Sequence, residues 1–271
     1  MTTETCVLCG GTAWMPMIEV QGHRILNCEG CGLARTEYLK PVEEAPSADL
    51  YSDKYYVRQG RKPVPPAKRV YQQWPRVKFL RKYRQGGRLL DMGCGQGFFV
   101  ARAKQKGFDA TGVDVSAFAR EFAKRELGVE LVTSTMEDAK FPPGSFDIVT
   151  MWHSLEHTVD PMDTLRRIHS WLRPGGLILI EVPDYGSYDA QKMGAEWEDW
   201  SMPYHRWHFT PEVVERMLKA CGFTGMQLKH MPSYYVRDRL RKVPVIGWFR
   251  KIIWRFFRGN FFRMVAEKPN G

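Results

Sequence analysis

The stretch LLDMGCGQGFF, residues 89–99, decides the fold because three closely spaced glycines join an apolar run to a helical run. GRLLDMG (87–93) predicts a buried strand, and FFVARAKQKG (98–107) predicts a helix. Glycines in such a turn let the backbone approach a ligand, and the helix N-terminus behind it offers unpaired N–H groups. Phe98 stands where the dinucleotide fingerprint G-x-G-x-x-G has its third glycine, so the pattern is D-x-G-x-G-x-G instead. We therefore expect a ligand-binding turn that departs from the dinucleotide pattern.

The rest of the middle region alternates between apolar runs and helical runs. Strands that alternate with helices imply a parallel sheet covered on both faces. Ligands bind such sheets beyond the carboxyl ends of the strands, where the strand order reverses. The pattern therefore predicts an α/β fold with a doubly wound, mostly parallel sheet. The predicted strands are 87–93, 108–116, 129–134, 145–153 and 177–184, and the predicted helices are 98–107, 117–127, 160–176 and 210–222.

Asp114 closes the second of these strands. A carboxylate at this place is able to accept hydrogen bonds from both hydroxyls of a ribose. The alternative is that the glycines only form a turn and that Asp114 caps the following helix. The occurrence of both features in this order favours a nucleoside-binding site.

Four of the six cysteines form two pairs of identical spacing, and each pair ends in glycine. Two thiolates three residues apart on a tight turn reach one metal ion, and two such turns complete a tetrahedral site. The alternatives are two disulfides, which a reducing compartment disfavours, or chance. With four thiolates and no open position, the site is predicted to be a structural zinc site, with iron as the alternative metal. The predicted ligands are Cys6, Cys9, Cys28 and Cys31.

Four motifs occur in order along the chain: LLDMGCGQGFF, GVDVS, FPPGSFDIVTMWHSLEHTVDP and WLRPGGLILIEVPD. They resemble the successive motifs of class I S-adenosylmethionine-dependent methyltransferases, and the resemblance covers about residues 70–270. It implies a seven-stranded Rossmann-like sheet. More narrowly, the paired cysteines, YSDKYY and W…MPYHRWHFTPE…GF resemble bacterial methyltransferases of sugar, polysaccharide or natural-product pathways.

This resemblance implies that S-adenosylmethionine is the methyl donor. The backbone of the glycine turn would hold its methionine portion with Asp91 near the ammonium group, Asp114 would bind the ribose, and Val115 would flank the adenine. Thr135 and Met136 fall where the adenine edge is bound in the family. The full set of expected cofactor contacts is Asp91, Gly93, Cys94, Gly95, Gly97, Asp114, Val115, Thr135, Met136 and Trp152.

A catalytic base is expected directly after the fourth strand, in SLEHTVDP. By the resemblance, His157 faces the methyl group, and a neutral imidazole has a suitable pKa for removing a proton. Glu156 is placed to orient it. The alternative is that both residues cap the helix that begins near Asp160.

WEDWSMPYHRWHF (197–209), which we call the aromatic segment, follows neither a helix period nor a strand period. We expect it to form the roof of the acceptor pocket, because aromatic rings exclude water and stack on sugars, rings or headgroups. His205 is a second candidate base. The alternative is a packing cluster whose histidines have structural partners. The predicted acceptor contacts are Tyr55, Tyr56, His153, Trp200, Tyr204 and His208.

The net charge of +10 is uneven, since residues 54–90 carry twelve Lys or Arg and no Asp or Glu. Residues 237–263 carry nine basic residues and one acidic residue. Such segregation suggests an anionic partner, and the alternative is a merely solubilising surface. Within this second stretch, 248–258 has an aromatic face and a basic face, which suits either a helix at an anionic membrane surface or a lid helix.

Three parts are expected along the chain: a zinc module over 1–45, a basic linker and active-site helix over 46–85, and the methyltransferase domain over 86–271. An amphipathic insertion interrupts the last part at about 236–259. The start of the chain lacks the pattern of a secretory signal, and no apolar run is long enough to span a membrane. We therefore expect a cytoplasmic protein that reaches the inner face of the membrane only peripherally.

Together these observations predict a methyltransferase that acts on a small-molecule, sugar or lipid-linked acceptor in bacterial glycan, lipid or secondary metabolism. One alternative is a zinc-containing RNA methyltransferase, which the basic charge suits. A second is a non-catalytic binding module on a methyltransferase fold. The aromatic segment favours a small acceptor over nucleic acid.

Overall fold

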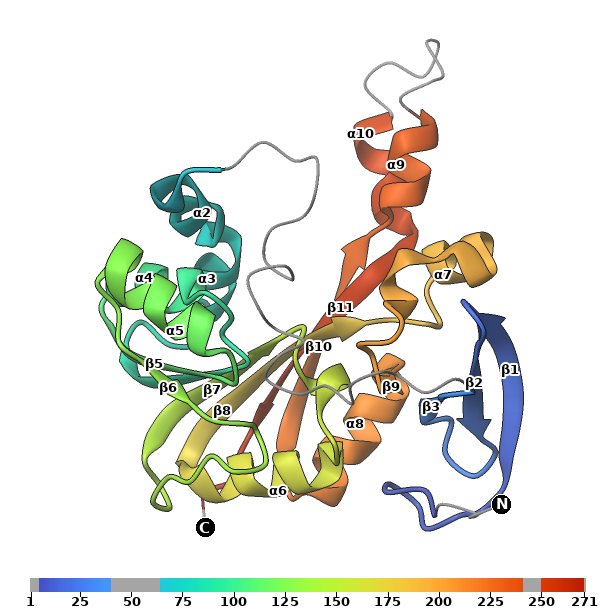
Figure 1. The fold of residues 1–271 in the computed structure, drawn as a ribbon, viewed down its shortest axis with the longest axis horizontal. Helices are drawn as coiled ribbons and strands as arrows, with labels where there is room; N and C mark the ends of the chain where they lie inside the picture. Colours follow the sequence, from blue (N-terminus) through green and yellow to red (C-terminus); the bar gives the residue numbers. More distant parts are fainter. Residues whose placement is uncertain (1–4, 40–63, 241–249, 271) are drawn as a thin grey trace. The chain divides into compact units, whose positions relative to one another are not determined.

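The computed structural model describes residues 5–39, 64–240 and 250–270, and its elements are labelled in Figure 1. The chain divides into two compact units. Unit 1 comprises Met1–Val42, Leu155–Met162 and Ile180–Ala266, and unit 2 comprises Glu43–Ser154, Asp163–Leu179 and Glu267–Gly271. The predicted boundary near residue 45 falls outside the described residues, and the one near residue 85 lies just before β4 begins at Gly87.

A seven-stranded sheet of order β10-β11-β8-β7-β4-β5-β6 confirms the predicted fold class. β4 pairs in parallel with both β5 and β7, and β5 pairs in parallel with β6. The strands are apolar runs bounded by turn residues, as expected for a sheet that helices cover. Their bounds are β4 Gly87–Met92, β5 Phe108–Asp114, β6 Leu131–Thr133, β7 Phe146–Trp152, β8 Leu172–Pro183, β10 Thr224–Pro232 and β11 Arg258–Glu267.

The helices of unit 2 follow the predicted alternation, and Figure 1 shows α2, α3, α4 and α5 gathered beside β5 and β6. Their bounds are α2 Pro66–Gln72, α3 Trp74–Leu80, α4 Phe98–Lys104, α5 Ala117–Phe122, continued by the π-turn η2 Ala123–Leu127, and α6 Pro161–Trp171. The remaining elements are α7 Tyr188–Met193, α8 Pro211–Ala220, α9 Tyr234–Leu240, α10 Arg250–Ile253 and the 3-10 turns η3 Leu155–His157, η4 Gly194–Glu196, η5 Glu198–Trp200 and η7 Trp254–Phe256.

Two helices end earlier than the sequence predicts. α6 stops at Trp171 rather than Gly176, because Pro174 disfavours helix at its own position and at Arg173. Lys268 donates hydrogen bonds to the carbonyls of His169 and Leu172 at this end of the helix. The following residues join β8, and Lys268 also pairs through its backbone N–H with the Gly176 carbonyl.

The amphipathic helix predicted over 248–258 also ends early. Within its described part, α10 stops at Ile253, η7 makes one tighter turn, and β11 already begins at Arg258. Trp248 and Phe249 lie outside the described residues. Within the described ranges, no helix has both the length and the apolar character that crossing a membrane requires.

Unit 1 contains a second, four-stranded antiparallel sheet of order β1-β2-β3-β9. Its first three strands, β1 Trp14–Val20, β2 His23–Cys28 and β3 Ala34–Glu37, carry the cysteine turns at their ends. Its fourth strand, β9 Trp207–His208, comes from the aromatic segment. The N-terminal module and the aromatic segment are therefore parts of one sheet, which the sequence did not indicate.

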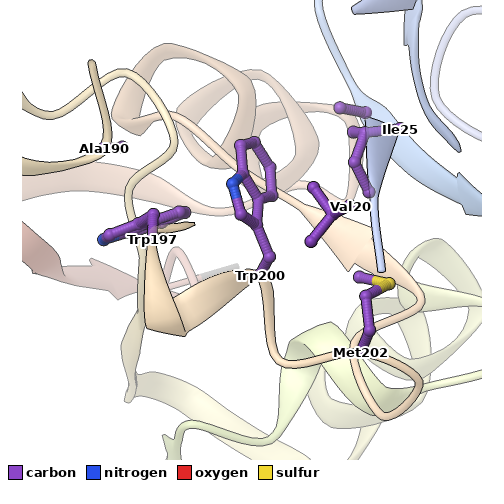
Figure 2. Packing of buried hydrophobic residues seen from close by; sticks show 7 residues of the cluster. Val20, Ile25, Ala190, Trp197, Trp200 and Met202 are labelled. Carbon is purple, nitrogen blue, oxygen red and sulfur yellow. The ribbon is translucent and has the colours of Figure 1, made fainter. Parts of the chain in front are cut away.

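The core below this small sheet explains much of the aromatic segment. Trp197, Trp200 and Met202 pack with Val20 and Ile25 of β1 and β2, as Figure 2 shows. The two indole rings meet edge to face, with their centroids 5.1 Å apart. Such rings bury a large apolar area, so this short three-stranded module gains a core that it could not build alone.

Candidate functional site

The glycine turn at the end of β4 is built as the sequence predicts. Gly93, Gly95 and Gly97 have φ angles of 70°, 53° and 73°, in the left-handed region that favours glycine. At Gly93 the space is also closed, since an added Cβ would lie 2.6 Å from the Cβ of Ser154 and 3.0 Å from the Cε of Met136. Gly97 is the N-cap of α4, so the turn leads directly into the helix N-terminus. We call residues 93–97 the cofactor turn.

Asp114 is held in place by the cofactor turn itself. Its Oδ2 accepts a hydrogen bond from the N–H of Gly95 at 2.7 Å, and its Oδ1 accepts one from Ser116 at 3.0 Å. A carboxylate oxygen is able to accept more than one hydrogen bond, so a ligand hydroxyl is able to join these backbone partners. This arrangement fits a ribose with its two hydroxyls directed at one side chain.

Asp91 is buried in the strand that precedes the turn, with 2% of its surface exposed. The hydroxyl of Thr150 donates a hydrogen bond to its Oδ1 at 2.7 Å. Burial raises the pKa of this carboxyl to about 7, although the Thr150 hydrogen bond and the charge of Arg76 act in the opposite direction. A cationic ligand group nearby would favour its charged form, so the residue fits the predicted place beside an ammonium.

The other predicted cofactor residues lie on loops that follow the strands, except Trp152, which ends β7. Cys94 is half-buried, and desolvation raises the pKa of its thiol well above the ordinary value, so the thiol stays neutral. Thr135 closes a turn with Asp138 through two hydrogen bonds. Val115 is half-buried after β5. Trp152 packs edge to face on Phe99, with the ring centroids 5.2 Å apart.

Two arginines of the basic stretch belong to this region, although no motif in the sequence assigns them a specific role. Arg69 of α2 donates a hydrogen bond to Gln96 at 2.8 Å and lies 4.1 Å above the ring of Phe98. Arg76 of α3 lies 5.1 Å above the ring of Trp152. The signal in the sequence is the run of positive charge without acidic residues, which suggests an anionic partner but does not single out these two arginines.

The four cysteines of the N-terminal module are close enough to share one ion. Their Sγ atoms lie within 4.8 Å of one another, and the Cys6–Cys31 and Cys9–Cys28 separations are both 3.5 Å. None of the described cysteines forms a disulfide. Tetrahedral zinc with bonds of about 2.3 Å places its sulfurs about 3.8 Å apart, so the thiolates fit a structural zinc ion. The backbone carbonyl of Cys31 also accepts a hydrogen bond from Arg216 of α8, within the same unit.

A second cluster in unit 1 joins the two candidate bases of the sequence analysis. Glu156 and His157 lie on η3, and His205 comes from the aromatic segment. The imidazole rings of His157 and His205 meet edge to face, with centroids 4.7 Å apart, and the Nε2 of His205 lies 4.0 Å from a carboxylate oxygen of Glu156. We call these three residues the histidine cluster. The sequence proposed its members as alternatives, whereas the structure brings them together.

The other histidine of the aromatic segment is enclosed by the small sheet. The hydroxyl of Thr36 donates to the backbone carbonyl of His205, so the Nε2 of His208, 3.0 Å away, must donate to Thr36. Burial lowers the pKa of His208 to about 3, which keeps the ring neutral. The ring of Trp200 lies edge to face on it, with the centroids 5.1 Å apart. Both residues have structural partners, and their predicted roles in acceptor binding stay predictions.

The other residues predicted to contact the acceptor are Tyr204, His153, Tyr55 and Tyr56. The backbone carbonyl of Tyr204 accepts a hydrogen bond from His157 at 2.9 Å. His153, directly after β7, has a φ of 56°, an uncommon backbone conformation for a residue other than glycine. Tyr55 and Tyr56 lie outside the described residues.

Comparison with known proteins agrees with these features. A family model described as a methyltransferase domain matches residues 67–228. The ubiquinone biosynthesis O-methyltransferase of Aeromonas salmonicida is 34% identical over 149 residues, which cover 51% of this chain and 63% of that protein. The protein of the same name from Cereibacter sphaeroides is 30% identical over 158 residues, 54% of this chain and 64% of that protein. The chain thus spans less than two thirds of the length of either relative.

A solved structure supports the fold separately. The crystal structure of a SAM-dependent methyltransferase from Archaeoglobus fulgidus superposes with a TM-score of 0.57 at 20% identity, and it covers 74% of this chain and 94% of that chain. The family match extends over more than half of this chain and includes the cofactor turn and Asp114. The chain therefore belongs to the methyltransferase domain family.

Proposed function

We propose that this protein transfers a methyl group from S-adenosylmethionine to a hydroxyl oxygen of a small-molecule acceptor. The observation that carries the proposal is the pairing of the cofactor turn with Asp114, whose two oxygens are oriented by the backbone N–H groups of Gly95 and Ser116. An irregular turn with three left-handed glycines and an immobilised carboxylate suits a nucleoside better than it suits packing alone.

The histidine cluster supplies the proton acceptor that a hydroxyl nucleophile requires. When bound, the cofactor provides an electrophilic methyl group. His157 is the most exposed member of the cluster, and its Nδ1 donates to a backbone carbonyl, which leaves Nε2 as the basic nitrogen. Nε2 takes the hydroxyl proton as the oxygen attacks the methyl carbon. Buried Glu156 then stabilises the imidazolium.

An oxygen acceptor agrees with the names of the two relatives from Aeromonas salmonicida and Cereibacter sphaeroides, which are O-methyltransferases. We place the acceptor in bacterial glycan, lipid or secondary metabolism, as a sugar, a small ring compound or a lipid-linked molecule. The four thiolates hold a structural zinc ion, which stabilises the small sheet that carries the aromatic segment.

Labelled S-adenosylmethionine tests the proposal directly. Purified protein is incubated with the label and a cell lysate, and the label is followed into lipid, small-molecule and RNA fractions. Label in a small-molecule or lipid fraction supports the proposal, and loss of that label in Asp114→Ala ties it to this site. Absence of cofactor binding by calorimetry would favour a non-catalytic binding module instead.

Substitutions in the histidine cluster identify the base. His157→Ala is expected to lower turnover by about 10²–10⁴ while it leaves cofactor affinity nearly unchanged, because a base acts only in the transition state. If His205→Ala abolishes turnover and His157→Ala retains most of it, His205 is the base. If both variants keep full activity, the acceptor needs no histidine base.

An RNA acceptor is the second candidate, and the basic composition favours it. Several described arginines of the basic stretch are engaged within the protein, however. Arg84 donates a hydrogen bond to the Gly175 carbonyl, and Arg88 donates one to the Gly144 carbonyl. Steeply salt-dependent binding to ribosomal RNA fragments would reverse our preference.

Peripheral contact with an anionic membrane remains a further proposal for residues 248–258. Among the described residues of this segment, Phe256 is 81% exposed and follows Arg255, a combination that suits a lipid interface. Sedimentation with vesicles that contain anionic lipid, compared between the wild type and Phe256→Ser, tests this contact. Equal sedimentation would argue against it.

A further inference from the structure

We propose that the histidine cluster of Glu156, His157 and His205 binds a divalent first-row transition-metal ion, separately from the four-cysteine site. The effect of this ion on methyl transfer rests on the proposed function, but the binding of the ion does not. The metal site itself rests on the arrangement of the three side chains in unit 1.

The protonation of both rings follows from their backbone partners. The Nδ1 of His157 lies 2.9 Å from the carbonyl of Tyr204, and the Nδ1 of His205 lies 2.9 Å from the carbonyl of Asp199. A carbonyl oxygen only accepts hydrogen bonds, so each Nδ1 must be the donor. In a neutral ring the lone pair then lies on Nε2. This is the orientation in which metal-binding histidines are commonly fixed by a backbone carbonyl.

Three electron-pair donors therefore converge. One ligand atom from each residue lies within 4.8 Å of the others, and the Nε2 of His205 lies 4.0 Å from a carboxylate oxygen of Glu156. The Glu156 side chain is completely buried, with 0% of its surface exposed. A metal ion bound among these groups would offset the charge of the buried carboxylate.

The separations favour an ion over a shared proton. A proton shared between nitrogen and oxygen holds them at about 2.7–2.9 Å. Metal bonds of about 2.0–2.2 Å place neighbouring ligand atoms about 3.0–3.5 Å apart. The ligand atoms of the cluster are up to 4.8 Å apart, so binding an ion would draw them together by roughly 1 Å.

The ligand types indicate the class of ion. Two imidazoles and one carboxylate suit zinc, iron, nickel or manganese better than calcium or magnesium, which prefer oxygen. Three protein ligands also leave coordination positions open. An acceptor hydroxyl bound there would become more acidic and would lose its proton to water. Its oxygen would then be a stronger nucleophile for the methyl carbon, with the sulfur of the cofactor as the leaving group. In this form, His157 and His205 act as ligands and not as the proton acceptor.

Titration with Mn²⁺, followed by electron paramagnetic resonance, tests the site on the full chain. Manganese prefers oxygen and nitrogen ligands, so it does not compete for the four thiolates. We expect wild-type protein to bind one Mn²⁺ per chain and Glu156→Gln to bind it at least about 10-fold more weakly. His230→Gln, on β10 and outside the cluster, is the matched control and should bind Mn²⁺ like the wild type.

The folded state and cofactor affinity are checked by circular dichroism and calorimetry in the same samples. If Glu156→Gln is unfolded, His205→Asn serves as the second variant. Equal Mn²⁺ affinity in the wild type and the folded variant, or no binding to either, overturns the proposal.

The outcomes also separate this inference from the proposed function. If the wild type binds no Mn²⁺ and the His157→Ala variant loses turnover, the metal site is refuted and His157 stands as the base. If Mn²⁺ binds as expected but S-adenosylmethionine does not, the metal site stands and the proposed function fails. If turnover falls after dialysis against a chelator and returns with Mn²⁺ while the zinc content stays constant, the metal site and methyl transfer are both supported, and His157 is a metal ligand rather than the base.

Discussion

The cofactor turn and the aromatic segment are both irregular stretches with conspicuous composition, but they hold their shape in different ways. The cofactor turn depends on glycine conformations and on Asp114, which lies on the next strand of the same parallel sheet. The aromatic segment depends on β1, β2 and β3, which precede it by about 170 residues. Changes in the first region should therefore reduce ligand affinity, and changes in the second should reduce stability.

The largest effect is expected in the module that the aromatic segment completes. Cys28→Ser removes one of the four thiolates, and a structural metal contributes folding free energy directly. We expect loss of the zinc ion and rapid hydrogen exchange over residues 5–39. Elemental analysis and exchange mass spectrometry measure the two effects. Less than about a tenth of an equivalent of metal in fresh wild-type protein would contradict the zinc assignment.

The next effect concerns the aromatic core. Trp200→Ala removes a buried indole that packs with Val20 of β1, Ile25 of β2 and the ring of His208, so stability should fall by about 3–5 kcal/mol. Urea denaturation measures this loss. Leu228→Ala, at a position that is 46% exposed, is the control and should change stability little. A large loss of cofactor affinity in the folded Trp200→Ala protein would show that the two regions are not independent.

Asp114→Ala is the corresponding change in the region of the cofactor turn. It removes the acceptor for the ribose hydroxyls, so affinity for S-adenosylmethionine should fall by about 2–3 kcal/mol, or roughly 30-fold or more. Asp109→Ala, an exposed position on the same strand, is the matched control for calorimetry. An unchanged dissociation constant in Asp114→Ala would mean that the ribose binds elsewhere.

The smallest effect is a pH dependence from His208. Its pKa is about 3 in the folded protein and near 6.5 when unfolded, so the unfolded state takes up the proton first as the pH falls. Stability is therefore fully present above pH 6.5 and is lost progressively towards pH 3. Between pH 7.5 and 5.5 we expect His208 to account for a loss of about 1.4 kcal/mol.

His208→Gln tests this dependence because glutamine keeps a donor for Thr36 but does not titrate. The variant should lose less stability than the wild type over the same pH interval in urea denaturation. Parallel pH profiles for the two proteins would show that His208 is not the group responsible.

The sequence by itself determined the methyltransferase fold, the glycine turn with Asp114, and the grouping of four cysteines in one cluster. These features depend on local periodicity, on left-handed glycines and on short spacings, all of which are properties of neighbouring residues. The end of the C-terminal helix could not be read locally, because Arg258 already belongs to β11. Pro174 is a local signal for the end of α6, but Lys268, which caps its last carbonyls, comes from almost 100 residues away.

Only the tertiary structure decided what the aromatic segment does. Its rings follow no period because their partners belong to another part of the chain, and β9 is only two residues long because it completes a sheet that starts near the N-terminus. The same long-range packing encloses His208 and brings His205 to Glu156 and His157. Side chains that meet across about 50 or 170 residues leave no spacing rule in the sequence, so the histidine cluster became visible only once the chain was folded.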